Sequence, residues 1–133
     1  MTGDFVLYAD GASRGNPGPS SIGAVLYDSD GVAVAEVSEA IGVTTNNVAE
    51  YRALIAGLEA ALALGVARIE VRLDSLLLVR QVRGEFRVKA PGLQPLHRKV
   101  RALESRFEGF SIGHVRREKN TVADGLANAA LDA

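Results

Sequence analysis

The order in which two hydrophobic periodicities follow each other along this chain restricts its fold more than any other feature. Three early segments, 5–10, 22–27 and 32–41, alternate apolar with polar or small residues, which is typical of β-strands. The spacing then becomes helical in an alanine-rich stretch that contains Tyr51 and Leu58 and ends at Gly65, a favourable C-terminal cap. The chain is therefore predicted to begin as an antiparallel meander of three strands and to continue with a helix.

The rest of the chain mixes the two periodicities. The expected elements are a strand at 69–73, a short helix at 75–82, a loop at 84–94, a helix at 95–107, a strand at 110–115 and a final helix at 121–131. The Asp-Ser-Asp-Gly sequence at 28–31 predicts a hairpin turn, and the Gly- and Pro-rich segment 11–19 is expected to end the first strand. The order βββαβααβα predicts an α/β fold with a five-stranded mixed sheet, three antiparallel strands and then two parallel ones, flanked by helices. Without an internal repeat or linker, residues 1–133 are expected to form a single domain.

The composition excludes several classes of protein. A chain of 133 residues can bury a core of its own, and the absence of cysteine excludes disulfides and thiolate metal sites. No apolar run approaches the roughly 18 residues of a membrane span, and the N-terminus lacks the pattern of a signal peptide. We expect a cytoplasmic monomer without a membrane segment.

Charge is unevenly distributed along the chain, although the formal net charge is −1. Residues 80–119 hold 11 of the 15 Lys and Arg residues but only four Asp and Glu residues. An acidic part that holds metal and a basic part that holds a polyanion suit an enzyme that acts on nucleic acid. Solvated helix faces explain the charge bias alone equally well.

Four carboxylates lie where a predicted strand or helix starts or stops, namely Asp10, Glu50, Asp74 and Asp124. Two of them end apolar strands, one precedes the first helical stretch, and one follows Asn120 at the start of the last helix. Carboxylates brought together from such distant points repel one another strongly unless cations lie between them. We therefore expect a divalent-metal site and a metal-dependent enzyme.

Each of these carboxylates also has a purely structural explanation. Asp10 would close a strand and start a turn, and Glu50 would complete a capping box with Asn47 as the N-cap. Asp74 would cap the next helix, and Asp124 would complement the dipole of the last one. One such explanation is enough for one residue, but four coincidences with particular neighbours favour a shared metal site.

Four segments together resemble ribonuclease HI. They are residues 10–18, 44–50, 74–75 and 120–128, and both their spacing and the element order fit that family along the whole chain. The likeness is to the compact bacterial and archaeal branch, because residues 84–95 leave no room for the basic protrusion of larger relatives. The chain is also similar to the N-terminal domain of actinobacterial bifunctional proteins, so fusion to a C-terminal phosphatase-like domain in a longer parent chain stays open.

The resemblance implies an endonuclease that hydrolyses the RNA strand of RNA–DNA hybrids by a two-metal-ion mechanism, leaving 5′-phosphate and 3′-hydroxyl ends. The same four carboxylates would be catalytic and would hold two Mg²⁺ or Mn²⁺ ions, hard cations that prefer carboxylate oxygens. Many relatives have a histidine in the loop before the last aspartate, but residues 116–120 contain none. Arg117 is the candidate substitute, a catalytic cation near the departing phosphate.

The resemblance also implies a set of substrate-binding residues, which are Gly11, Ala12, Ser13, Asn16, Thr45, Asn46, Asn47, Arg80 and Phe86. The first three would face the RNA ribose with their backbone, and the asparagines would contact the strands near the cut, where a 2′-hydroxyl distinguishes RNA. Thr45 would grip a DNA-strand phosphate, and Arg80 and Phe86 would line the DNA-strand path. The alternative explanations for these residues are structural, namely turn formation, helix capping and ordinary solvation of charged side chains.

Two other functions stay open. A hybrid-binding module without turnover is disfavoured, because binding alone does not need four clustered carboxylates. A DNA nuclease of the same fold, such as a resolvase or an integrase-like enzyme, is disfavoured by Asn46, Asn47 and the segment 10–18.

Overall fold

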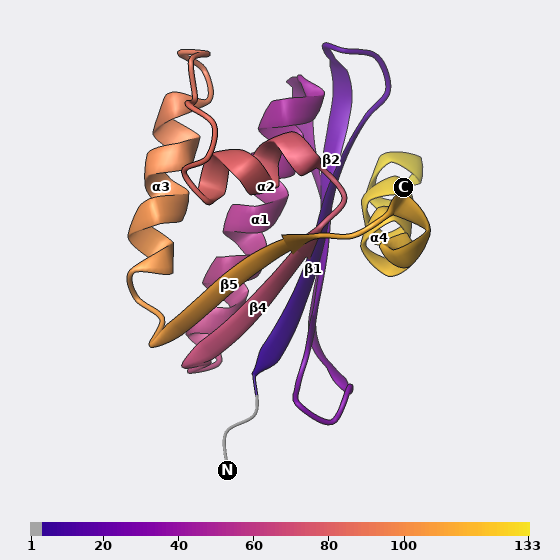
Figure 1. Ribbon diagram of the computed structural model, residues 1–133. Coiled ribbons are helices and arrows are strands. Elements are labelled where there is room, and N and C mark those ends of the chain that lie inside the picture. Colours follow the sequence, from indigo (N-terminus) through magenta and orange to yellow (C-terminus); the bar gives the residue numbers. More distant parts are fainter. Residues whose placement is uncertain (1–3) are drawn as a thin grey trace.

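The computed structural model describes residues 4–133, and a five-stranded sheet with the order β3-β2-β1-β4-β5 forms its centre (Figure 1). The strands are β1 (Phe5–Ser13), β2 (Gly18–Tyr27), β3 (Ala33–Thr44), β4 (Arg68–Leu73) and β5 (Gly109–His114). The helices are α1 (Asn46–Ala63), α2 (Leu76–Val82), α3 (Gln94–Glu104) and α4 (Thr121–Asp132), and a single 3₁₀ turn, η1 (Arg117–Lys119), precedes α4. Strands β1, β2 and β3 pair antiparallel, whereas β4 pairs parallel with both β1 and β5. The predicted fold class and element order are confirmed.

The segment 11–19 is the main point at which the sequence prediction of the elements is wrong. It does not end the first strand at Asp10, because β1 continues to Ser13 and β2 begins at Gly18. The turn is confined to residues 14–17, and the Arg14 N–H donates to the Pro19 carbonyl across it at 2.8 Å. Glycine and proline lower the strand propensity of this segment, but pairing with neighbouring strands overrides that preference, because residues 11–13 pair with 20–22 and residues 18–19 pair with 43–44.

Helix boundaries also differ from the prediction. Helix α1 begins at Asn46 because Thr45 caps it, with its Oγ1 accepting the Val48 N–H at 3.3 Å. Helix α3 ends at Glu104, and Phe107 is buried beyond the end of the helix rather than on it. Apolar spacing alone could not separate a helical residue from a buried residue of the following turn.

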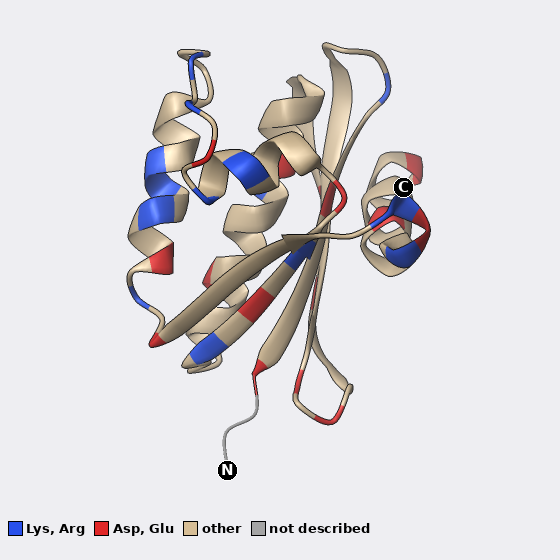
Figure 2. Cartoon of the chain, viewed as in Figure 1, with Lys and Arg blue, Asp and Glu red and all other residues tan. Residues whose placement is uncertain are grey.

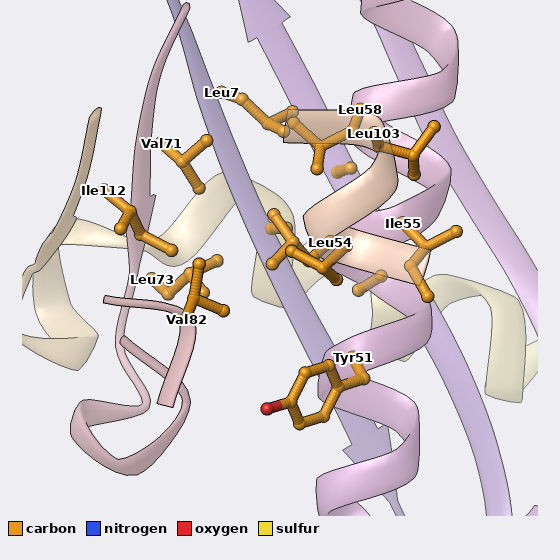
Figure 3. Close-up of a cluster of buried hydrophobic side chains, with 14 of the residues drawn as sticks. Leu7, Tyr51, Leu54, Ile55, Leu58, Val71, Leu73, Val82, Leu103 and Ile112 are labelled. Carbon is orange, nitrogen blue, oxygen red and sulfur yellow. The ribbon is translucent and has the colours of Figure 1, made fainter. Parts of the chain in front are cut away.

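The helices divide between the two faces of the sheet. Helices α1, α2 and α3 cover one face, and α4 lies alone against the other, over β1, β2 and β3 (Figure 1). The main core lies between α1 and the sheet, where Leu54 and Leu58 face Leu7, Val71 and the neighbouring strand residues (Figure 3). Helix α4 is held to the sheet by separate contacts, because the Ser21 and Ser38 hydroxyls donate to two carbonyls in the middle of the helix at 2.5 and 2.6 Å.

Basic side chains are also unevenly distributed between the two faces of the sheet. Seven of the 15 Lys and Arg residues lie on α2, α3 and the segment between them, on the side of the sheet that α1 also covers (Figure 2). Within residues 4–133, none of the helices is both long enough and apolar enough to cross a bilayer.

Candidate active site at the ends of β1 and β4

The parallel pairing of β1 and β4 brings the first two carboxylates together. Ala9 on β1 is the register partner of Leu73, the last residue of β4, so Asp10 and Asp74 follow these partners at the same edge of the sheet. Ligand sites in sheets of this type form at such an edge, outside the carboxyl ends of parallel strands. Asp10 is buried there, with 9% of its surface exposed.

Glu50 reaches this edge because α1 packs directly on the backbone of β1. A Cβ added to Gly11 would lie 2.4 Å from the carbonyl carbon of Ala49 and 2.4 Å from the amide nitrogen of Glu50. No side chain larger than hydrogen fits at that distance, so glycine lets the helix approach the strand. This contact sets Glu50 beside Asp10, and it gives Gly11 a packing role that its place in the sequence motif did not reveal.

Asp124 reaches the site through an equivalent contact on the opposite face. Gly23 pairs with Asp10 in the β1–β2 register, and its added Cβ would lie 2.2 Å from the Ala123 carbonyl oxygen and 2.5 Å from the Ala127 amide nitrogen. The backbone of α4 therefore touches β2 next to Asp10. Asp124 lies in the first turn of α4, so its position near the helix N-terminus, expected from the sequence, is confirmed.

The four carboxylates influence one another's ionisation. Burial raises the pKa of Asp10 to about 8, reinforced by the charge of Asp74, by a hydrogen bond and the charge of Asp124, and by the charge of Glu50. Burial also raises the pKa of Glu50, with a further contribution from Asp74, whereas a hydrogen bond from Ser75 and the charge of Arg117 lower it. The fold thus collects all four predicted carboxylates into one electrostatic cluster.

The chemistry of this cluster suits a hard cation. A cavity of about 10 Å³, room for roughly one water-sized group, is lined by Asp10, Glu50, Asp74 and four neighbours. The Glu50 Oε2 atom is buried without a hydrogen-bond partner, and such an orphan needs a cation or a donor. Nevertheless, no group of three or more His, Cys, Asp and Glu side chains among residues 4–133 is arranged to hold a metal ion. The metal role of the four carboxylates therefore stays a prediction.

A larger cavity of about 410 Å³ lies elsewhere, against the first turn of α4 and beside Tyr8, Tyr27 and Arg72. None of the four carboxylates lines it. Volume alone therefore does not identify the site, and the clustered carboxylates carry the chemical argument.

The structural explanations offered for Glu50 and Asp74 are wrong. Thr45 rather than Asn47 is the N-cap of α1, so Glu50 is not at the capping-box position. Ser75 rather than Asp74 caps α2, with its Oγ accepting the Leu78 N–H at 3.3 Å. Both carboxylates are thus free of the helix-capping duty that would have accounted for them.

The predicted substrate residues near the first turn lie together. The Asn16 Oδ1 atom accepts the Asn46 N–H at 3.1 Å, which joins the β1–β2 turn to the start of α1. Thr45 and Asn47 are exposed beside this contact, and the backbone of Gly11, Ala12 and Ser13 leads from Asp10 toward the turn. These residues form one continuous surface next to the carboxylates.

The remaining predicted residues fall at two other places. Arg117 lies in η1, exposed, and close enough to Glu50 for its charge to lower the pKa of that carboxyl. Arg80 of α2 holds its guanidinium 5.2 Å from the ring centre of Phe86, so these two side chains form a cation–π pair away from the carboxylates.

Sequence reasoning gave no role to two residues that contact the carboxylates. Ser75 interacts with Glu50, and the Asn120 side-chain amide donates to Asp74 Oδ2 at 3.2 Å. Both residues directly precede a helix, at the N-cap position, where Ser and Asn are ordinary, so their type alone did not distinguish capping from contact with a carboxylate.

Comparison with known proteins identifies the family. Residues 8–130 match the family model described as reverse transcriptase-like. The chain is 50% identical to ribonuclease HI of Halobacterium salinarum over 94% of its own length and 63% of that protein's. The crystal structure of that archaeal RNase H1 superposes with a TM-score of 0.95 at 49% identity, covering 98% of each chain.

Two further structures agree. The N-terminal RNase H domain of the bifunctional protein Rv2228c of Mycobacterium tuberculosis, solved as a fusion, has a TM-score of 0.95 at 48% identity, covering 98% of this chain and 100% of that one. LC11-RNase H1, isolated from compost, has a TM-score of 0.92 at 43% identity, covering 97% of each chain, and was solved in complex with an RNA/DNA hybrid. The chain belongs to the ribonuclease HI family of enzymes. It spans about a third of the length of Rv2228c.

Proposed function

We propose that this chain is an endonuclease that cuts the RNA strand of RNA–DNA hybrids. The observation that carries the proposal is the convergence of Asp10, Glu50, Asp74 and Asp124 from four separate elements into one cluster. Membership of the ribonuclease HI family supports the activity, and the hybrid bound to LC11-RNase H1 supports the substrate.

Divalent cations complete the proposed site. Asp10, Glu50, Asp74 and Asp124 would hold two Mg²⁺ or Mn²⁺ ions through their carboxylate oxygens, and the buried Oε2 of Glu50, which has no hydrogen-bond partner, supports this assignment. Two such ions would supply an activated water and neutralise the charge of the leaving 3′-oxygen, so that the products carry 5′-phosphate and 3′-hydroxyl ends.

The residues of the chain itself hold and orient the reacting groups. Asp10 and Asp74, adjacent at the sheet edge, would anchor the cluster, Glu50 would act on the side nearest the RNA, and Asp124 would complete it from the opposite face. The Arg117 guanidinium lies near Glu50, where a permanent positive charge would stabilise the departing phosphate.

Substrate choice rests on the surface next to the carboxylates. The joined segments of Asn16 and Asn46, with Asn47 exposed beside them, offer side-chain amides that donate to and accept from a 2′-hydroxyl. The backbone of Gly11, Ala12 and Ser13 would follow the RNA ribose, and Thr45, at the N-terminus of α1, would hold a DNA-strand phosphate. The Arg80–Phe86 pair would contact the DNA strand farther along.

The test is cleavage of matched RNA–DNA, RNA–RNA and DNA–DNA duplexes, each labelled on one strand, with Mn²⁺ or Mg²⁺ present. We expect cutting of the RNA strand of the hybrid only, and complete loss of cutting in the Asp10→Asn variant with hybrid binding retained. An uncut hybrid under conditions where another ribonuclease H cuts it would refute the proposal. Binding without cutting would favour the binding module, and cutting of duplex DNA would favour a DNA nuclease of this fold.

The cellular setting belongs to the same proposal. A monomer in the cytoplasm, with or without a phosphatase-like domain on a longer parent chain, is consistent with the likeness to the N-terminal domain of Rv2228c.

A further inference from the structure

We propose that Asn120 is a positioning residue that fixes three of the four active-site carboxylates relative to one another, an inference that rests on the proposed function of the cluster. Asn120 immediately precedes α4 and is almost completely buried, with 1% of its surface exposed. Its backbone and side chain together contact the three chain segments that carry Asp10, Asp74 and Asp124.

The side-chain amide makes two of these contacts. The Asn120 Nδ2 atom donates to the Ala9 carbonyl at 3.1 Å and to Asp74 Oδ2 at 3.2 Å. Ala9 directly precedes Asp10, so one amide group bridges β1 and the residue after β4 where the pairing of the two strands ends. Both partners are acceptors, which requires the nitrogen rather than the oxygen of the amide to face them.

The backbone makes the third contact. The Asn120 carbonyl accepts the Asp124 N–H at 3.1 Å, which is the first hydrogen bond of α4. The same residue that hydrogen-bonds Asp74 therefore also fixes the position of Asp124. A displacement of Asn120 would change the distance from Asp124 to both other carboxylates at once.

The hydrogen bonds that Asn120 does not make distinguish positioning from an ordinary structural role. Thr45 and Ser75 each cap their helices with a side-chain oxygen, whereas Asn120 makes no side-chain capping bond to α4. Its Oδ1 atom is buried without any hydrogen-bond partner. A buried acceptor left unpaired and a helix left uncapped both oppose stability. The side chain of Asn120 therefore contacts the carboxylate segments instead of capping α4.

Two substitutions distinguish positioning of the carboxylates from helix capping. Asn120→Ala removes the bridge. Asn120→Ser also removes it, because the shorter side chain cannot reach Asp74, but a serine oxygen restores a preferred N-cap to α4 and favours folding. The matched control is Asn128→Ala, which removes an equivalent amide from the same helix, one that donates only to the Asp124 carbonyl at 3.0 Å.

The first readout is Mn²⁺ binding without nucleic acid, followed by electron paramagnetic resonance of the free ion. We expect at least tenfold weaker binding in both Asn120 variants and a change below twofold in Asn128→Ala. The second readout is steady-state cleavage of a hybrid, where kcat should fall at least tenfold while KM stays within about twofold, since no substrate contact is removed. If Asn120→Ser restores wild-type Mn²⁺ binding and kcat, Asn120 is only a structural cap and the proposal is overturned.

A third readout needs neither metal nor hybrid, and so separates this proposal from the proposed function. In the metal-free protein, the side-chain amide protons of Asn120 should exchange slowly with water in nuclear magnetic resonance spectra. Their signals should shift in Asp74→Ala and stay in place in Asn128→Ala. Rapid exchange, or signals unaffected by Asp74→Ala, would overturn the inference even if the hybrid is cut. If the hybrid is not cut but the spectra are as expected, the proposed activity is refuted and the positioning role of Asn120 stands.

Discussion

Asp10 is the residue whose properties depend most on the fold. On the sequence it is one aspartate at the end of a strand, whereas in the structure burial and three neighbouring carboxylates raise its pKa to about 8 from its ordinary 3.8. A carboxyl group in that state is neutral at pH 7 unless a cation stabilises its charge. The metal-free protein therefore keeps a proton at the point where the proposed metal would bind.

This proton predicts an unusual dependence of stability on pH. Between pH 4 and pH 8 the unfolded chain has lost the Asp10 proton and the folded chain has kept it, so the free energy of unfolding should fall as pH rises. The slope from one such group is at most about 1.4 kcal/mol per pH unit. Urea unfolding in a chelator at several pH values measures it.

The control for the pH prediction is Asp10→Asn, which removes this titrating group and should make the dependence less steep over this window, with the raised pKa of Glu50 accounting for the remainder. Saturating Mg²⁺ should raise the stability of the wild-type protein most at pH 8, where proton loss from the cluster is greatest. A wild-type slope equal to that of Asp10→Asn would contradict the assigned environment of Asp10.

Tyr51 carries a second prediction at the residue scale. It is fully buried on α1, and its hydroxyl donates to Gln81 Oε1 of α2 at 2.7 Å. Burial raises the pKa of Tyr51 to about 12, so the hydroxyl stays a donor at any physiological pH. Tyr51→Phe should cost about 1–2 kcal/mol in urea unfolding, because it leaves a buried acceptor unpaired. Tyr27→Phe is the matched control at a half-buried tyrosine that packs edge-on against Tyr8, and it should change stability by less than about 0.5 kcal/mol.

At the scale of elements, two helices approach the sheet through glycine, and each approach brings in one carboxylate. Helix α1 rests on Gly11 and carries Glu50, whereas α4 rests on Gly23 and carries Asp124. Main-chain atoms lie where a Cβ would be in both cases, so a larger residue cannot be accepted by rotating a side chain.

Gly23→Ala should therefore displace α4. We expect a loss of about 1–3 kcal/mol or more in stability and at least a tenfold loss of hybrid cleavage, because Asp124 moves away from Asp10. Gly125→Ala is the matched control on the same helix, where an added Cβ meets nothing within 4 Å. That change should leave cleavage intact and stabilise the protein by about 0.5–1 kcal/mol, since alanine is the better helix former. Equal effects of the two substitutions on activity would contradict the packing argument.

These contacts also show what the sequence could and could not predict. Periodicity identified the order of all the strands and α-helices, and the four carboxylates were singled out by their places at element ends. The capping residues were assigned wrongly at α1 and α2, because Thr45 and Asn47 or Asp74 and Ser75 are equally good caps on paper and only packing chooses between them. The bridge made by Asn120 joins residues 111 and 46 positions away, and no local pattern encodes such a contact.

At the scale of the whole molecule, the acidic cluster and the basic side chains are carried by different elements. The carboxylates lie just beyond the last β1–β4 register pair and on α1 and α4, whereas Lys and Arg gather on α2, α3 and the segment between them (Figure 2). A hybrid duplex held over both regions would place its RNA strand at the carboxylates and its DNA strand along the basic elements.

Salt dependence tests this arrangement. Binding of a hybrid to Asp10→Asn, measured by fluorescence anisotropy, should weaken steeply as salt increases, because bound phosphates release counterions. Arg80→Ala should reduce the slope of log K against log salt by about one, the loss of one phosphate contact. Arg68→Ala, on β4 and ion-paired with Asp4, should leave the slope unchanged. A slope unaffected by Arg80→Ala would remove α2 from the proposed path.

We propose that four carboxylates from distant parts of the chain form one cation site. The most direct measurement is anomalous diffraction from crystals soaked in Mn²⁺. We predict strong peaks within about 2–2.5 Å of oxygens of Asp10 and Asp74, with Glu50 and Asp124 completing the coordination after rotation of their side chains. Peaks confined to other parts of the molecule, or their absence at saturating Mn²⁺, would contradict the account.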